Sequence, residues 1–184
     1  VTGSAVDHRG HCYVSVVDPA SNGFTFEEAR GACEAAGMTL ASIRAPDQES
    51  FIETNLLRSA ATAKYWIGAA KEPGTAWTWI DGLRFFWEDW ETDQGAEETA
   101  ACGALSHDSS HALDGWTSED CQSTQPGFIC LKDTELAVPE ATGLFKLLVT
   151  TADGRTAAPD EPPLWSTVRP PCSIPVPLLD ALRG

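Results

Sequence analysis

Basic residues are scarce in this chain. It holds 12 Lys and Arg against 27 Asp and Glu, which leaves a net charge of -15. Such a charge repels the phosphates of nucleic acids and the headgroups of anionic lipids. No window approaches the roughly 18 consecutive apolar residues of a membrane-spanning helix. We therefore expect no nucleic-acid partner and no membrane insertion.

The motifs of common catalytic centres are also missing. The chain contains no G-x-S-x-G, H-E-x-x-H, G-x-x-x-x-G-K or G-x-G-x-x-G sequence. Carboxylates are plentiful, but none stands in an apolar setting of the kind that suits acid–base catalysis. We therefore expect no enzyme and no catalytic residues.

Cysteine is present in an even number, but without close pairs. The absence of any C-x-x-C sequence removes support for a zinc ribbon or a thioredoxin-like centre. Six scattered cysteines are typical of a disulfide framework made in an oxidising compartment, with a reduced cytosolic protein as the alternative. Their spacing alone permits 15 pairings. The sequence thus indicates an extracellular protein, either secreted or at the cell surface, with these cysteines in disulfides: Cys12, Cys33, Cys102, Cys121, Cys130 and Cys172.

Two helices are predicted in the first third of the chain. In TFEEARGACEAAG, Thr25 followed by Glu28 forms a capping box, and Gly37 supplies a left-handed stop. The second predicted helix covers residues 45–60, with Pro46 in its first turn.

Short apolar runs between turn residues predict strands. Asp81 and Gly82 suit a hairpin turn. The irregular segment 83–102 is best explained as a long loop. The predicted strands lie in MTLASI, YWIGAA, WTWIDG, CGALS, GWTS and GFICLK.

The composition changes after Lys132. Residues 133–184 hold 8 of the 12 prolines and only one convincing strand, at 144–151. We expect an N-terminal lead (1–11), a folded domain (12–131) and a Pro-rich C-terminal extension (132–184). The extension either packs back on the domain, through Cys172, or is ordered by a partner chain.

Together these segments resemble a C-type lectin-like domain over residues 12–131. The resemblance is carried by Cys12-Tyr13, FEEARGAC, LASI, WIGA, WTWIDG, Trp90, GWTSEDC and GFIC. It implies an α+β fold in which two helices flank short antiparallel sheets and a long irregular loop.

The resemblance also implies two disulfides, Cys33 with Cys130 and Cys102 with Cys121. In the long form of the family, the cysteine before the tyrosine bonds to one further upstream. No cysteine precedes Cys12 here. Its expected partner is Cys172, with a cysteine of a second chain as the alternative.

Sugar-binding members of the family hold a calcium ion whose vacant coordination positions accept two sugar hydroxyls. Its ligands come from a Glu-Pro-Asn or Gln-Pro-Asp tripeptide, from a glutamate two residues before the third framework cysteine, and from an Asn-Asp pair after the strand tryptophan. Here the loop has no such tripeptide, Ala100 stands at the glutamate position, and Thr117 and Ser118 replace the pair. Calcium favours carboxylates, so we expect no cofactor at the family site. A weakly held calcium among neighbouring acids is the alternative, through Glu97, Glu98, Glu119 and Asp120.

Two further groups of residues are candidate sites. His107 and His111 have the i, i+4 spacing of a zinc pair on a helix, but the segment suits a hairpin turn better. Aromatic residues framed by charges resemble a protein-binding hot spot for a basic partner, and the alternative is an apolar plug under the long loop. The candidate partner surface comprises Arg84, Phe86, Trp87, Glu88, Asp89, Glu91 and Asp93.

We therefore expect a secreted, non-catalytic C-type lectin-like module that contacts other extracellular proteins or matrix within a larger assembly. One alternative is a lectin that binds glycans through an unconventional calcium site or without metal. Another is an acidic matrix protein that binds mineral surfaces.

Overall fold

The computed structural model describes residues 2–18, 22–57, 63–96, 101–108, 115–133 and 172–175, together with residues 99 and 178. The strand predicted at 144–151 lies outside these residues. Within the described part of the chain, no helix is long and apolar enough to cross a membrane.

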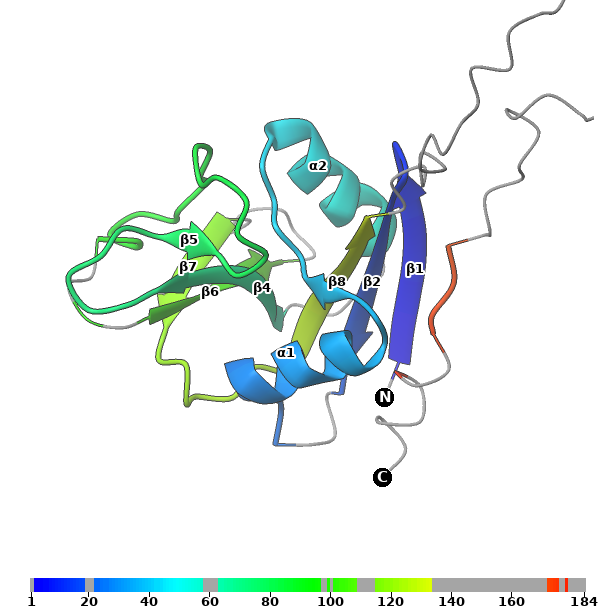
Figure 1. Cartoon of the computed structure of the whole chain (residues 1–184), viewed down its shortest axis with the longest axis horizontal. Helices are drawn as coiled ribbons and strands as arrows, with labels where there is room; N and C mark the ends of the chain where they lie inside the picture. Colours follow the sequence, from blue (N-terminus) through cyan, green and yellow to red (C-terminus); the bar gives the residue numbers. More distant parts are fainter. Residues whose placement is uncertain are drawn as a thin grey trace, which may run out of the picture. The chain divides into compact units, whose positions relative to one another are not determined.

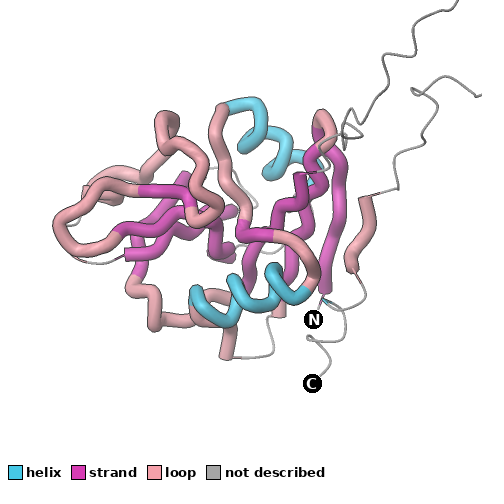
Figure 2. The backbone as a smooth tube through the Cα atoms, in the orientation of Figure 1, coloured by secondary structure: helices cyan, strands magenta, loops and turns pink. Residues whose placement is uncertain are grey.

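The described strands form one mixed sheet (Figures 1 and 2). Along it the strands run in the order β1-β2-β8-β4-β6-β7, while β3 pairs with β8 and β5 pairs with β4. The pair β4–β8 is parallel and the other pairs are antiparallel. The predicted α+β class is confirmed. The strands are β1 (Thr2–His8), β2 (His11–Val17), β3 (Thr39–Leu40), β4 (Ala63–Lys71), β5 (Thr78–Trp79), β6 (Ala101–His107), β7 (Gly115–Glu119) and β8 (Gly127–Asp133).

Helix α1 (Phe26–Ala35) begins at the predicted capping box, in which Thr25 Oγ1 accepts from Glu28 N and Glu28 Oε2 accepts from Thr25 N. Helix α2 (Pro46–Phe51) is shorter than the predicted 45–60. It continues as a π-helical segment, η1 (Ile52–Leu56). The Asn55 amide donates to Phe51 O at 3.1 Å, so a side chain competes for a carbonyl that an α-helix would use.

Alternate strand residues point to opposite sides of the sheet. Buried residues lie on both sides, so the sheet contributes to two cores. On the side of α1, Trp66 and Phe128 pack with the helix residues Phe26, Ala29 and Cys33. The other side packs against α2, η1 and the segment that follows β5. Its buried residues include Tyr13, Ile43, Ile52, Tyr65, Ile67, Leu105, Trp116 and Ile129. Burial raises the pKa of Tyr65 on this side.

The segment expected as the N-terminal lead contains β1, which pairs with β2 from Thr2↔Val17 to His8↔His11. One local prediction needs correction. The turn at Asp81 and Gly82 does not join two strands. It ends β5, whose hairpin partner is the preceding strand β4, and leads into the long loop.

Three disulfides lie within the chain: Cys33–Cys130, Cys102–Cys121 and Cys12–Cys172. The first two are the pairs that the resemblance implied, and the third is the expected partnership of Cys12 with Cys172 rather than with a second chain. Cys172 brings residues of the C-terminal extension against the domain. Leu178 is fully buried in the core on the α1 side, and Ile174 packs against the same core.

Candidate binding surface at the long loop

A cluster of aromatic rings supports the long loop between β5 and β6. Trp116 of β7 is fully buried at its centre. Trp79, Phe85, Trp87 and Trp90 each place a ring centroid within 6.0 Å of it, in edge-on contacts. The long loop is therefore built around a rigid aromatic support, although it has little regular backbone hydrogen bonding.

One indole N–H group anchors the loop, and another anchors the strand β7 beneath it. Trp77 Nε1 donates to Gly95 O at 2.8 Å. Trp116 Nε1 donates to Glu49 Oε1 at 2.7 Å and so links β7 to α2. Gly95 has φ +81° and lies so close to Trp90 that a Cβ atom there would meet the indole at 2.6 Å. Only glycine fits at that contact.

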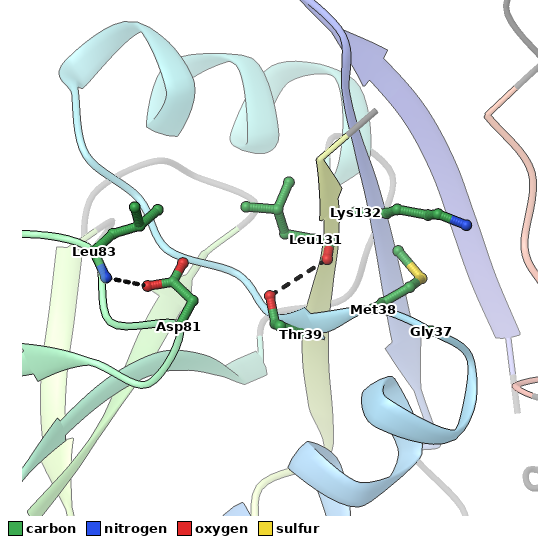
Figure 3. Close-up of a pocket in the computed structure, with 7 residues that line it drawn as sticks. All are labelled: Gly37, Met38, Thr39, Asp81, Leu83, Leu131 and Lys132. Carbon is green, nitrogen blue, oxygen red and sulfur yellow. Dashed lines mark hydrogen bonds between the residues drawn. The ribbon is translucent and has the colours of Figure 1, made fainter. Parts of the chain in front are cut away.

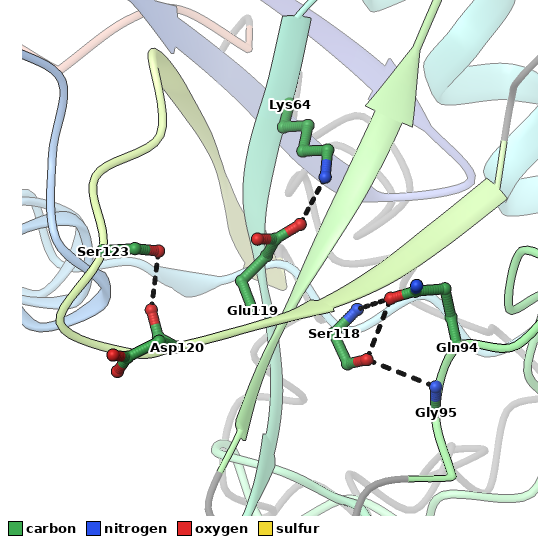
Figure 4. Close-up of polar contacts among 7 residues, drawn as sticks. All are labelled: Lys64, Gln94, Gly95, Ser118, Glu119, Asp120 and Ser123. Atoms are coloured by element: carbon green, nitrogen blue, oxygen red, sulfur yellow. Dashed lines mark hydrogen bonds and ion pairs between the residues drawn. The ribbon is translucent and has the colours of Figure 1, made fainter.

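The resemblance places Ser118 at one of the family's calcium-ligand positions, and the loop occupies the polar groups of this residue (Figure 4). Gln94 Oε1 accepts from Ser118 N at 2.9 Å and from Ser118 Oγ at 3.0 Å, while Gly95 N donates to Ser118 Oγ at 3.3 Å. The Ser118 hydroxyl therefore ties the loop to β7. At the neighbouring position, Thr117 is 3% exposed and Oγ1 has no hydrogen-bond partner within the described residues.

The two acids that follow are also engaged (Figure 4). Glu119 forms an ion pair with Lys64 of β4. Asp120 shapes the turn after β7, because its Oδ1 accepts from Gln122 N at 2.9 Å and its carbonyl accepts from Ser123 Oγ at 2.7 Å. Both residues therefore serve contacts within the fold.

Metal ligands do not gather in the described part of the chain: no group of three or more His, Cys, Asp or Glu could hold an ion there. Glu97, Glu98 and Ala100 lie outside the described residues. His107 is buried at the end of β6. His111, the other histidine of the i, i+4 pair, also lies outside the described residues.

The candidate partner surface divides into an outward and an inward set. Phe86 is 68% exposed, and Arg84, Glu88, Asp89 and Asp93 are exposed around the same loop. Trp87 instead packs edge-on against Trp116 at 5.3 Å, so it belongs to the aromatic support. Glu91 is half-buried beside Gly115.

The sequence did not predict a role for three residues of this region: Gln94, Glu49 and Lys64. A signal existed for Glu49, because it precedes Ile52 and Leu56 by three and seven positions and so shares their helix face. The roles of Gln94 and Lys64 depend on contacts with a distant strand, for which one sequence offers no signal.

The comparisons with known proteins agree with this geometry. The sequence model of the lectin C-type domain matches residues 22–132. The chain therefore belongs to the C-type lectin domain family.

Similar proteins include two human receptors. The chain is 32% identical to the secretory phospholipase A2 receptor over 111 residues, which is 59% of this chain and 7% of that protein. It is 28% identical to C-type mannose receptor 2 over 152 residues, which is 80% of this chain and 8% of that protein. The chain thus spans only a small part of the length of these relatives.

Among solved structures, a Ca2+-independent C-type lectin from Saxidomus purpuratus superposes with a TM-score of 0.58. It is 24% identical, and the match covers 70% of this chain and 91% of that chain. At this identity the likeness shows the fold alone.

Proposed function

We propose that this chain is a non-catalytic extracellular module that binds proteins or matrix without the family's calcium-dependent sugar site. The proposal rests on the hydrogen bonds that Ser118 makes with Gln94 and Gly95. A calcium ion at this position would need several oxygen ligands, with carboxylates among them. Here the side chains offer hydroxyls, and one of these already anchors the loop.

The neighbouring acids support the same conclusion. Glu119 is neutralised by Lys64, and Asp120 is used in a turn. A calcium ion that recruited either carboxylate would have to break these contacts. The alternative calcium site would thus depend on the acids of residues 97 and 98.

The exposed ring of Phe86 is the contact that we assign to a partner. A large apolar side chain with 68% exposure is a candidate anchor for a protein interface. The exposed carboxylates of Glu88 and Asp89 on the same loop favour a basic partner. The six disulfide-bonded cysteines and the receptor relatives support an extracellular location, with this chain as one part of a larger assembly.

Calcium titration calorimetry, followed by a glycan array with and without chelator, tests this function. The expected result is no saturable calcium heat and no glycan signal that the chelator removes. Chelator-sensitive glycan binding would overturn the proposal in favour of a calcium-dependent lectin. Glycan binding that survives the chelator would equally overturn it, in favour of a metal-free lectin.

A further inference from the structure

A groove of about 350 Å³ lies between the start of the long loop and the strands β3 and β8 (Figure 3). Its lining includes Met38, Thr39, Leu83 and Leu131. Its lining includes neither Thr117 nor Ser118, the described residues at which the resemblance places calcium ligands of the family.

The lining of the groove is mixed, with Met38, Leu83 and Leu131 as its large apolar residues and Thr39, Asp81 and Lys132 as its polar ones. Met38 and Leu131 are 5% and 3% exposed and belong to the two cores of the domain. Leu83 is 36% exposed and, with Phe86, is one of two large hydrophobic residues exposed in the described part of the chain. An aliphatic chain of a ligand bound here would cover Leu83 and would leave the buried residues Met38 and Leu131 in place.

One carboxylate lies beside Leu83 in this lining. Asp81 Oδ1 accepts from Leu83 N at 2.9 Å, which fixes the side chain at the turn. The second carboxylate oxygen makes no hydrogen bond or ion pair with the described residues. Lys132 also lines the groove, but its ammonium points away from Asp81 (Figure 3). The groove thus places Asp81, a carboxylate fixed by a backbone hydrogen bond, beside the side chain of Leu83, with the Lys132 ammonium directed away from it.

We propose that this groove binds an arginine side chain of a basic polypeptide partner. The aliphatic stem lies along Leu83, Met38 and Leu131, and the guanidinium donates to Asp81. Long basic side chains bury an apolar stem while keeping a charged head at a polar group. Arginine fits better than lysine because its planar head can hold a carboxylate that is already fixed by a backbone bond.

The charge of the chain supports this choice of occupant. A net charge of -15 draws a basic partner towards the surface and disfavours an acidic one. Phe86 lies on the same loop as Asp81 and Leu83, so one partner can reach both features. This inference rests on the proposed protein-binding function and names the side chain that the partner supplies.

Nuclear magnetic resonance titration of the ¹⁵N-labelled full chain tests the groove directly. The probes are N-acetyl-arginine amide and its neutral isostere, N-acetyl-citrulline amide. Arginine is expected to shift the amides of Met38, Thr39 and Leu83 in a saturable way, and citrulline is expected to bind more weakly by about three- to tenfold. Equal binding of the two probes, or shifts confined to other residues, would contradict the inference. Shifts of the same amides on concentrating the protein alone would show a second copy as the occupant and would also contradict it.

The variant Asp81→Asn keeps an oxygen for Leu83 N and removes only the charge. It is expected to weaken arginine binding by about three- to tenfold and to leave citrulline binding unchanged. Glu72→Gln is the control, since it removes one negative charge from an exposed turn outside the candidate partner surface and the groove, and it should leave binding at the wild-type level. If both variants weaken binding equally, the groove is not the site.

The two proposals fail separately. Calcium-dependent glycan binding would overturn the proposed function whatever Asp81 does. If arginine and citrulline bind equally, while calcium titration and the glycan array give the results expected above, only the inference about the groove is overturned.

Discussion

The two faces of the sheet support different kinds of structure. On the α1 side, Phe26, Trp66 and Phe128 cover a regular helix whose backbone groups bond within the helix. On the other side, aromatic rings around Trp116 support an irregular loop, which is anchored by the Trp77 indole N–H and by two backbone hydrogen bonds to Trp116. The difference shows that a regular element needs mainly apolar cover, whereas an irregular loop also needs directed polar anchors.

Removal of one central ring from each face gives the largest expected effects. Trp116→Ala and Phe128→Ala should each lower the free energy of unfolding by about 3–5 kcal/mol, because both side chains are fully buried. Chemical denaturation followed by circular dichroism measures this loss.

The two variants should differ in which residues lose protection from amide hydrogen exchange. Trp116→Ala removes ring contacts with Trp87 and Trp90 and leaves Glu49 Oε1 without its indole donor. Amide hydrogen exchange should therefore rise in residues 81–95 for Trp116→Ala and remain low there for Phe128→Ala. Equal exchange in this loop for both variants would show that the two faces do not act separately.

The disulfide between Cys12 and Cys172 extends the α1 side to the C-terminal residues. The double variant Cys12→Ser/Cys172→Ser should lower the free energy of unfolding by about 2–4 kcal/mol. Limited proteolysis should also cut near residues 172–175 more quickly, since Leu178 would lose its covalent tether. Leu178→Ala with the disulfide intact is the control that separates loss of the tether from loss of packing. Unchanged stability and proteolysis in the double variant would mean that the disulfide does not hold this segment.

The same contrast between faces explains what the sequence could predict. The capping box at Thr25 and Glu28 set the start of α1 because the signal is local. The apolar run of WTWIDG likewise predicted a strand, and its residues Trp77 and Trp79 are buried. In the loop, Trp87 points inwards and Phe86 points outwards. No local sequence motif predicts which of the two is exposed. The role of Gln94 depends on Ser118, 24 residues further along, so only the folded chain reveals it.

Gln94 offers a sharper test of the polar anchors. Gln94→Ala removes the acceptor for Ser118 N and Oγ, which are partly buried. The free energy of unfolding should fall by about 1–2 kcal/mol. Gln122→Ala, on an exposed turn, is the control and should change stability little. Loop exchange that stays at the wild-type rate in Gln94→Ala would show that the aromatic rings alone hold the loop.

The smallest expected effect lies at the start of α1, where polar anchoring is confined to one capping box. Thr25→Ala should lower the free energy of unfolding by about 1 kcal/mol and leave exchange in the long loop unchanged. Hydrogen bonds from the Thr25 backbone and side chain hold the pKa of Glu28 below its ordinary value of 4.5. Because the folded pKa is the lower one, this contribution is complete above the unfolded pKa and is lost as the pH falls through the folded pKa. Wild-type protein should therefore lose more stability on acidification than Glu28→Gln. An identical pH dependence in the two proteins would show that the carboxylate adds nothing to the cap beyond what a neutral amide provides.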